Sequence, residues 1–319
     1  MKAAIYDQPG TPDVLYYADV PDPVCPTDGI LIRVEAIAIE GGDLINRAVS
    51  PPPSSPFVVG YAAAGVVVAV GENVSDRQVG QKVTSFDLAG SHAELRAVAA
   101  SQTWPVPEGL DMSAAAVLPI AFGTAHHCLF ARGALKRGET VLIQAGAGGV
   151  GVAAIQLAHR AGATVLATVS GAERAKRLLS LGLDHAIDYR AVNVVEEAAR
   201  FTDERGVDLV IDPVGLTLQA SLATLRPEGR LVFVGNAGGS KLDIDLWPAL
   251  QANQSLSGVF MGTQFTKPEV YGVVAGLLER AALGKLDVLI DRTFPLSAAA
   301  EAHAYAESNS RLGRVVLIP

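Results

Sequence analysis

The second half of the chain alternates short, predominantly apolar runs with amphipathic segments. Runs of strand length occur at residues 140–144 ("TVLIQ"), 164–169, 185–188, 207–212 and 230–235. Between them lie segments whose apolar residues have helical spacing, at 150–161, 173–181, 192–202 and 216–225. Continuous apolar strands that alternate with helices indicate a parallel sheet covered on both faces. The pattern predicts a doubly wound, nucleotide-binding α/β domain, which we place at residues 119–259.

The first half is interrupted much more often. Val/Ile-rich runs at 30–36, 64–70 and 82–86 are separated by clusters of Pro, Gly and Asp, which suggests an antiparallel barrel-like domain over residues 1–118. The segment "VSPPPSSPF" at 49–57 cannot be helix or central strand, because successive prolines remove donors and fix φ. We expect the tail, 260–319, to complete this domain with a helix at 270–282 and a final strand "RVVLIP".

Four glycines fall within "QAGAGGVG" at 144–151, between a predicted strand and a predicted helix. Gly146, Gly148 and Gly151 satisfy G-x-G-x-x-G at the place where this motif binds a dinucleotide. The first glycine permits a tight turn, the second lets a pyrophosphate approach the backbone, and the third allows close packing of helix on strand. The sequence thus predicts dinucleotide binding, and the alternative is a purely structural turn.

The type of dinucleotide is decided at the end of the second strand, where a carboxylate would bind the adenosine ribose hydroxyls. Ser170 and Gly171 stand there instead, and Arg174 follows one helical turn later. A guanidinium suits a 2′-phosphate, so we predict NADPH rather than NADH. The alternative is that Arg174, Lys176 and Arg177 only form the solvated face of a helix.

Composition and charge exclude several classes of function. A length of 319 residues favours two domains, and a net charge of -8 without a basic run argues against nucleic-acid binding. The N-terminus lacks the pattern of a signal peptide, and the most apolar stretch, 57–71, is too short to span a membrane, so we expect a cytoplasmic protein with no membrane partner. Cys25 and Cys128 lie far apart and have no CxxC companions, which excludes a disulfide framework and a cysteine-built zinc lobe.

Several stretches together resemble the medium-chain dehydrogenase/reductase superfamily over essentially the whole length. They are "AAGVVVAVG" at 63–71, "AAAVLPIAFGTA" at 114–125, "QAGAGGVGVAAIQLA" at 144–158, "LGLDHAIDY" at 181–189 and "LRPEGRLVFVG" at 225–235. The closer resemblance is to the zinc-free quinone oxidoreductase branch, the zeta-crystallin-like proteins. The fold that this implies is a GroES-like β-barrel catalytic domain followed by a Rossmann domain.

The two segments in which zinc-dependent members of the superfamily carry metal ligands differ here. "IEGGDL" at 39–44 puts Glu40 or Gly41 at the cysteine position, and in "VVGYAA" at 58–63 Tyr61 and Ala62 replace His-Glu. These positions offer at most one zinc ligand, so we expect no metal. Without a Lewis acid, reduction of an electrophilic acceptor is a better hypothesis than alcohol oxidation. Quinone oxidoreductases usually carry Asn in place of Glu40, whereas Asp43 and Arg47 fit that branch.

The resemblance implies hydride transfer from NADPH to a quinone or an α,β-unsaturated carbonyl compound. One alternative is a stand-alone enoyl reductase acting on an acyl thioester, and another is a non-catalytic NADPH-binding protein. The resemblance also implies a homodimer, formed through the last strand of the nucleotide domain near 256–262.

The resemblance assigns roles to individual residues. For the nicotinamide half it implies Thr124, Val234, Gly235 and Asn236, and for the pyrophosphate it implies the turn that contains Gly146, Gly148, Gly149, Val150 and Gly151. For the adenosine phosphate it implies Ser170, Arg174 and Tyr189. Phe260 and Met261 either line the nicotinamide pocket or are plain core residues of a strand, and Arg311 precedes the last strand, where the family often presents a basic residue to the cofactor.

Three residues are candidates for contact with the acceptor oxygen. Tyr61 could donate a hydrogen bond from its hydroxyl, the alternative being a tyrosine packed in the barrel. His126 could do the same, although a packed imidazole is the simpler interpretation. Asp43 either takes part in the reaction or orients a loop.

Overall fold

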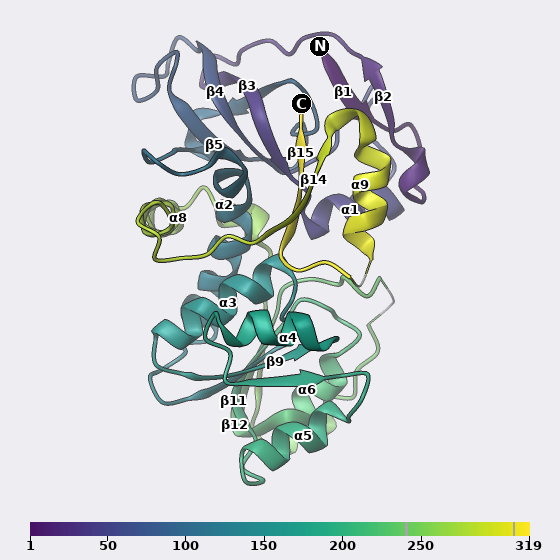
Figure 1. Ribbon diagram of the computed structural model, residues 1–319, viewed down its shortest axis with the longest axis vertical. Coiled ribbons are helices and arrows are strands. Elements are labelled where there is room, and N and C mark those ends of the chain that lie inside the picture. Colours follow the sequence, from purple (N-terminus) through teal and green to yellow (C-terminus); the bar gives the residue numbers. More distant parts are fainter. Residues whose placement is uncertain (240–241, 309) are drawn as a thin grey trace. The chain divides into compact units, whose positions relative to one another are not determined.

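The computed structural model describes residues 1–239, 242–308 and 310–319 (Figure 1). The chain forms two compact units. One consists of Met1–Gly123 together with Gly262–Pro319, and the other of Thr124–Met261. We call them the barrel unit and the nucleotide unit, and each is described by itself.

The nucleotide unit is built on a six-stranded parallel sheet with the order β10-β9-β8-β11-β12-β13. β8 and β11 are neighbours, and the strand order reverses between them. In doubly wound sheets this reversal lies beside the crevice where a nucleotide binds. The strands are β8 (Thr140–Ile143), β9 (Thr164–Val169), β10 (His185–Asp188), β11 (Val207–Asp212), β12 (Leu225–Phe233) and β13 (Ser255–Gly258).

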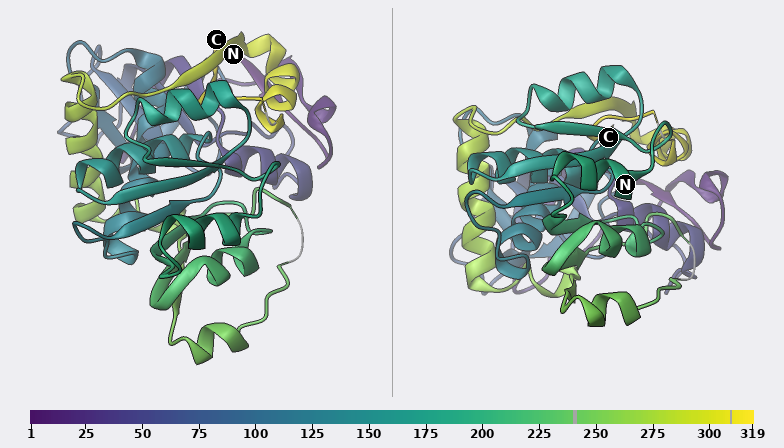
Figure 2. Two further views of the ribbon diagram at one scale, coloured as in Figure 1. Left: turned by 60° about the horizontal axis from the view of Figure 1, so that its bottom comes forward. Right: turned by 90° about the horizontal axis from the view of Figure 1, so that it is seen from below.

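Helices cover both faces of this sheet, as predicted (Figure 2). α3 (Gly149–Arg160) and α4 (Ala172–Leu179) lie on one face, and α5 (Val194–Phe201), α6 (Leu218–Thr224) and α7 (Trp247–Gln251) lie on the other. On the second face Leu142, Leu166 and Val210 of the strands pack against helix residues such as Leu222, and all four are at most 3% exposed. Burial on both faces explains why these strands are unbroken apolar runs.

The bounds of β9, β10 and β11 agree with the predicted ones, but β12 begins five residues earlier. Leu225 pairs with Val207, the register then shifts, and regular pairing resumes at Arg230. Glu228, in the interrupted part, has φ +61°, so the polar segment bulges without ending the strand. The prediction that Phe260 and Met261 lie in a strand is wrong, because β13 ends at Gly258.

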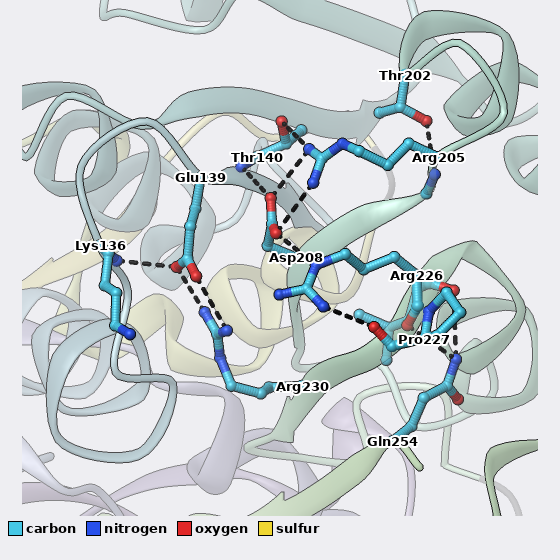
Figure 3. Close-up of polar contacts among 12 residues, drawn as sticks. Lys136, Glu139, Thr140, Thr202, Arg205, Asp208, Arg226, Pro227, Arg230 and Gln254 are labelled. Carbon is cyan, nitrogen blue, oxygen red and sulfur yellow. Dashed lines mark hydrogen bonds and ion pairs between the residues drawn. The ribbon is translucent and has the colours of Figure 1, made fainter. Parts of the chain in front are cut away.

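Charged residues join the amino-terminal ends of β8, β11 and β12 (Figure 3). Asp208 accepts hydrogen bonds from Arg205, Arg226 and the Thr140 N–H, and Arg230 pairs with Glu139 at 2.6 Å. Burial alone would raise the pKa of Asp208, but its hydrogen bonds lower it to about 2. These residues lie at the amino-terminal end of the strands, whereas the glycine turn follows the carboxyl end of β8. They therefore stabilise the sheet rather than the site.

The barrel unit contains a seven-stranded sheet, mostly antiparallel, and a separate two-stranded pair, β1–β2. Ile30, Ile32, Val67, Val83 and Val98 form a core cluster in which no side chain is more than 2% exposed. The tail returns to this unit, because β15 pairs with β3. The strands are β1 (Lys2–Ile5), β2 (Tyr16–Asp19), β3 (Gly29–Ala38), β4 (Ala62–Val70), β5 (Lys82–Phe86), β6 (Leu95–Ala99), β7 (Thr103–Pro105), β14 (Ile290–Pro295) and β15 (Arg314–Ile318).

The sequence pattern predicted α8 (Pro268–Ala282), but it predicted neither α7 nor three further helices of the described residues. α1 (Gly41–Val49) starts with two glycines, which are typical of loops. α9 (Ala299–Glu307) has mostly alanine on every side, so its amphipathic pattern is weak. α2 (Met112–His126) is apolar all round and contains Pro119, and a π-helix follows it at His127–Arg132.

The helical stretch Met112–Arg132 is long and apolar enough to cross a membrane, judged by length and composition alone. In the structure 78% of its most apolar 18-residue segment is buried, as is expected also for a core helix of a globular protein.

Candidate functional site

The glycine turn between β8 and α3 is tightly packed from within. Ala145 begins it with φ +53°. A Cβ on Gly146 would lie 2.8 Å from the Ala167 Cβ, and one on Gly151 would lie 2.4 Å from the Ala145 oxygen. At Gly148 the nearest atom, the Ala145 oxygen, is 3.4 Å away. Gly146 and Gly151 are therefore required by the protein itself, whereas Gly148 leaves backbone accessible to a ligand.

The first turn of α3 offers the donors that a pyrophosphate needs. The N-cap residue is Gly148, which has no side chain to cap the helix, and the first bond of the helix runs from the Val152 N–H to the Gly148 oxygen. The N–H groups of Gly149, Val150 and Gly151 thus precede the helical hydrogen-bond ladder. Their orientation and the helix dipole favour a bound anion.

Ser170 and Arg174 lie together at the carboxyl end of β9. The Arg174 Nη2 atom donates a hydrogen bond to the Ser170 hydroxyl at 2.7 Å, across the tip formed by Gly171 with φ +89°. The pair combines a hydroxyl with a guanidinium. Tyr189 follows β10 with 45% of its surface exposed, and the guanidinium of Arg190 lies 5.9 Å from its ring centre.

The other predicted cofactor residues of the nucleotide unit are more dispersed. Val234, Gly235 and Asn236 follow β12, and the Val234 N–H donates a hydrogen bond to the backbone carbonyl oxygen of Asp212 at 2.9 Å. Thr124 is 4% exposed. Met261 is buried and begins a short 3₁₀ turn, whereas Phe260 is 61% exposed, so Phe260 is not the core residue of the alternative interpretation.

Tyr61 packs on the first turn of α1 in the barrel unit. A Cβ on Gly42 would lie 2.2 Å from the Tyr61 ring, so the glycine is required for this approach. Asn46 Nδ2 donates a hydrogen bond to the Tyr61 hydroxyl oxygen at 2.7 Å, and Phe86 meets the ring edge-on. Burial and the nearby Asp43 raise the pKa of Tyr61 to about 12. The phenol is neutral, and its own proton remains available for donation.

Asn46 was missed in the sequence, although it determines how the Tyr61 hydroxyl can act. It lies four residues after Gly42 and therefore on the same face of α1. That relation is a usable signal only once α1 is known to be a helix.

Asp43 and Glu40 are fully buried at the start of α1. Asp43 Oδ2 accepts a hydrogen bond from the Glu40 N–H at 2.8 Å, and Glu40 pairs with Arg314 of β15. The positive charge of Arg311, in the loop before β15, also lowers the pKa of Glu40. The contact of Asp43 with its own helix favours an orienting role over a part in the reaction.

Burial makes the carboxyl groups of Glu40 and Asp43 weaker acids than exposed carboxyl groups. It raises the pKa of Glu40 to about 7, against the opposing charges of Arg314 and Arg311. Burial and the Glu40 charge raise the pKa of Asp43 to about 8. Because the unfolded chain ionises these groups near pH 4, their contribution to stability is complete below that pH and is lost as the pH rises toward 8.

We therefore expect the free energy of unfolding to fall between pH 6.5 and 8.5. His92 and His303, whose ring nitrogens lie 3.0 Å apart, have pKa values lowered by burial and act only below about pH 6.5. Urea unfolding at the two pH values measures the drop, and Asp43→Asn should reduce it. The exposed Glu72→Gln is the control, and an equal drop in wild type and Asp43→Asn would contradict the assignment.

His126 ends α2, and its ring packs against Phe130 with 4.8 Å between ring centres. It belongs to the nucleotide unit, whereas Tyr61 and Asp43 belong to the barrel unit. The structure thus brings the Tyr61 side chain to the start of α1, where Asp43 lies, and it gives His126 the aromatic neighbour expected of a packed imidazole.

Among residues 1–239, 242–308 and 310–319, no three His, Cys, Asp or Glu side chains gather in a way that could hold a metal ion. Tyr61 and Asn46, which are hydrogen-bonded to each other, are poor zinc ligands.

Comparison with known proteins identifies both units. Residues 26–108 match the "Alcohol dehydrogenase GroES-like domain" model, and residues 149–279 match the "Zinc-binding dehydrogenase" model. Human quinone oxidoreductase is 30% identical, covering 100% of this chain and 98% of the relative. The 2-haloacrylate reductase of Burkholderia sp is 32% identical, covering 100% and 99%. The structure of Escherichia coli quinone oxidoreductase complexed with NADPH is 28% identical, covers 100% of both chains, and superimposes with a TM-score of 0.92.

These matches cover the GroES-like barrel and the Rossmann sheet alike, and they agree with the glycine turn and with the strand order around β8 and β11. The chain is therefore an oxidoreductase of the medium-chain dehydrogenase/reductase superfamily, of the quinone oxidoreductase type.

Proposed function

We propose that this protein is a zinc-independent, NADPH-dependent reductase that transfers hydride to a quinone or an α,β-unsaturated carbonyl compound. The observation that carries the proposal is the neutral Tyr61 hydroxyl held by Asn46, at the position where zinc-dependent relatives carry a metal ligand. A neutral donor can stabilise negative charge that develops on an acceptor oxygen, but it does not lower the pKa of an alcohol as a metal does.

The residues of the nucleotide unit fit NADPH. Gly148 and the free first turn of α3 can receive the pyrophosphate, and Ser170 with Arg174 can bind the 2′-phosphate through charge-assisted hydrogen bonds. Escherichia coli quinone oxidoreductase, similar along its whole length, was solved with NADPH.

When bound, NADPH supplies the hydride. The protein has to orient the acceptor and stabilise the hydroquinone anion or enolate that results. Tyr61 can donate a hydrogen bond to that oxygen, and the proton that completes the reduction comes from water. The name of the related 2-haloacrylate reductase supports activated alkenes beside quinones as acceptors.

The proposal is tested by following NADPH oxidation at 340 nm with 1,2- and 1,4-quinones, enals, enones and a crotonyl thioester. The enzyme is treated with chelator and its zinc content is measured. Turnover of quinones or enones without bound metal is expected. Turnover only after zinc is added would contradict the proposal, and preferential turnover of the thioester would favour the enoyl reductase alternative.

Tyr61→Phe should lower kcat by about 10- to 100-fold, because it removes one hydrogen bond to a developing oxyanion, worth roughly 1.5 to 3 kcal/mol. The KM for NADPH should not change. Steady-state kinetics measure both values. Tyr16→Phe, which alters an exposed tyrosine of the same unit, is the control. Full turnover of Tyr61→Phe with every acceptor would exclude a catalytic role for this hydroxyl.

We also propose a homodimer that forms through β13, the edge strand of the parallel sheet. Leu256 on this strand is 42% exposed, and Leu246, Trp247 and Leu250 around α7 are more than half exposed. An uncovered strand edge beside apolar side chains can pair with a second copy.

Light scattering after gel filtration should therefore give twice the chain mass of 33.1 kDa. Leu256→Lys should give the single mass, because it places a charge in the pairing surface. Leu179→Lys, at an exposed leucine of α4, should leave the mass unchanged. A wild-type protein of 33.1 kDa would contradict the dimer.

A further inference from the structure

Four buried polar side chains of the nucleotide unit are connected by hydrogen bonds. Gln144 follows β8, Thr168 lies near the end of β9, Asp212 ends β11, and Ser221 lies on α6. None is more than 3% exposed. Hydrogen bonds connect them in the order Asp212, Ser221, Gln144 and Thr168, and we call this group the Asp212 series.

The carboxylate of Asp212 sets the direction of every bond in the series. Oδ1 accepts from the Val214 and Gly215 N–H groups at 2.8 and 3.1 Å, and Oδ2 accepts from the Thr217 and Ser221 hydroxyls, both at 2.7 Å. Both carboxylate oxygens of Asp212 thus act as acceptors. The Ser221 proton is therefore committed to Asp212.

The remaining directions follow from this commitment. The Ser221 oxygen is left to accept, and Gln144 Nε2 donates to it at 3.0 Å. This fixes the Gln144 amide with Oε1 toward Thr168, whose hydroxyl donates to it at 2.9 Å. The Thr168 oxygen then accepts the Ala145 N–H at 2.9 Å. No member can reverse its bond without breaking the next one.

Ala145, where the series ends, is the corner of the glycine turn. It has φ +53°, a conformation that non-glycine residues rarely adopt. Its carbonyl accepts the Gly148 N–H at 3.0 Å and lies against Gly151. Thr168 therefore holds, through its hydroxyl, the residue around which the turn is built.

The other end of the series reaches the loop after β11. Asp212 binds the N–H groups of Val214 and Gly215, and the position of a Cβ on Gly215 would be 2.4 Å from the Asn236 amide oxygen. The Gly238 N–H also bonds the Val214 oxygen at 2.9 Å. The Asp212 carboxylate is thus connected to two parts of the proposed cofactor site. Through the series it reaches Ala145 in the glycine turn, and directly it holds the loop at Val214 and Gly215, against which Asn236 lies.

We infer that Thr168, Gln144 and Ser221 are positioning residues for the dinucleotide, which hold the glycine turn in its binding conformation through the directional hydrogen bonds of Asp212. This inference rests on the proposed function, because it presumes that NADPH binds this turn. Neither Thr168 nor Ser221 needs to touch the cofactor for it to hold.

Thr168→Val keeps the shape of the side chain and removes the hydroxyl. It should weaken NADPH binding about tenfold, as expected for the loss of one buried hydrogen bond. Thr168→Ser retains the hydroxyl and should bind NADPH within about threefold of wild type. Titration of NADPH fluorescence gives both dissociation constants.

A second probe separates positioning from general damage. Adenosine 2′-monophosphate carries the phosphate expected at Ser170 and Arg174 but has no pyrophosphate, so Thr168→Val should bind it as wild type does. Thr140→Val, at a buried threonine of β8 at the opposite end of the sheet, is the control and should bind both ligands normally.

Ser221→Ala interrupts the series at a distance from the turn and should also weaken NADPH binding. Combined with Thr168→Val, it should add little, because both substitutions break one connected series. This variant also provides the test if Thr168→Val does not fold.

Each outcome decides between the claims. A wild-type protein that binds no NADPH overturns the proposed function and this inference together. If wild type binds NADPH, any of four results would overturn the inference alone. Two concern affinity: Thr168→Val and Ser221→Ala bind NADPH as wild type does, or Thr168→Val binds NADPH and adenosine 2′-monophosphate with equally weakened affinity. The other two are that Thr168→Ser fails to restore binding, or that the effects of the two substitutions multiply fully in the double variant.

Discussion

Arg174→Ala should raise the dissociation constant for NADPH by about 10- to 100-fold and leave that for NADH nearly unchanged. The guanidinium lies at the tip after β9 and donates a hydrogen bond to the Ser170 hydroxyl. A charge-assisted hydrogen bond to phosphate contributes roughly 1.5 to 3 kcal/mol, and that contact exists only for the phosphorylated coenzyme. Fluorescence titration with both nucleotides measures the change in preference.

Arg177→Ala is the matched control for this experiment. Arg177 lies on the same helix, is exposed, and donates a hydrogen bond to Ser180 at 3.2 Å. Its replacement should leave both affinities nearly unchanged. If the affinities of Arg174→Ala for NADPH and NADH both equal those of wild type, the phosphate assignment is refuted.

Gly151→Ala should abolish measurable NADPH binding and also lower the stability of the nucleotide unit. The new Cβ would lie 2.4 Å from the Ala145 oxygen and 2.7 Å from the Gly146 Cα, and backbone cannot move aside as a flexible side chain can. Forced overpacking of this kind typically costs about 1 to 3 kcal/mol. Urea unfolding and NADPH titration give the two effects.

Gly148→Ala, the matched variant in the same turn, should separate binding from stability. Gly148 has φ -77°, which alanine adopts readily, and the new Cβ would be 3.4 Å from its nearest neighbour. Stability should be unchanged, while NADPH binding weakens by about tenfold because the methyl group occupies the face that a pyrophosphate approaches. Unchanged binding in Gly148→Ala would contradict the placement of the pyrophosphate.

The parallel sheet was predictable because its signals are local. Burial on both faces makes β9 and β11 predominantly apolar runs, and glycines mark the turn in which backbone atoms approach closely. The extent of β12 was not predictable in the same way. Its first residue is fixed by pairing with Val207, and the polar residues that follow belong to a bulge.

The candidate site was only partly readable from the sequence. Tyr61 and Asp43 stand out because the resemblance places them at positions of known importance. Asn46 does not stand out, because the two glycines that begin α1 hide the helix that carries it. Those glycines are explained by the structure, since Gly42 gives Tyr61 the space to lie on the helix.

The sequence by itself determined the class of fold, the glycine turn and the replacement of a carboxylate by Ser170 and Arg174, since each depends on residues close together in the chain. Tertiary structure alone decided which polar side chains meet. Gln144 reaches Ser221 across 77 residues and Asn46 reaches Tyr61 across 15, and such pairs are set by strand order and helix packing. A hydrogen bond depends on distance and direction in space, so its partner cannot be identified before the elements have been assembled.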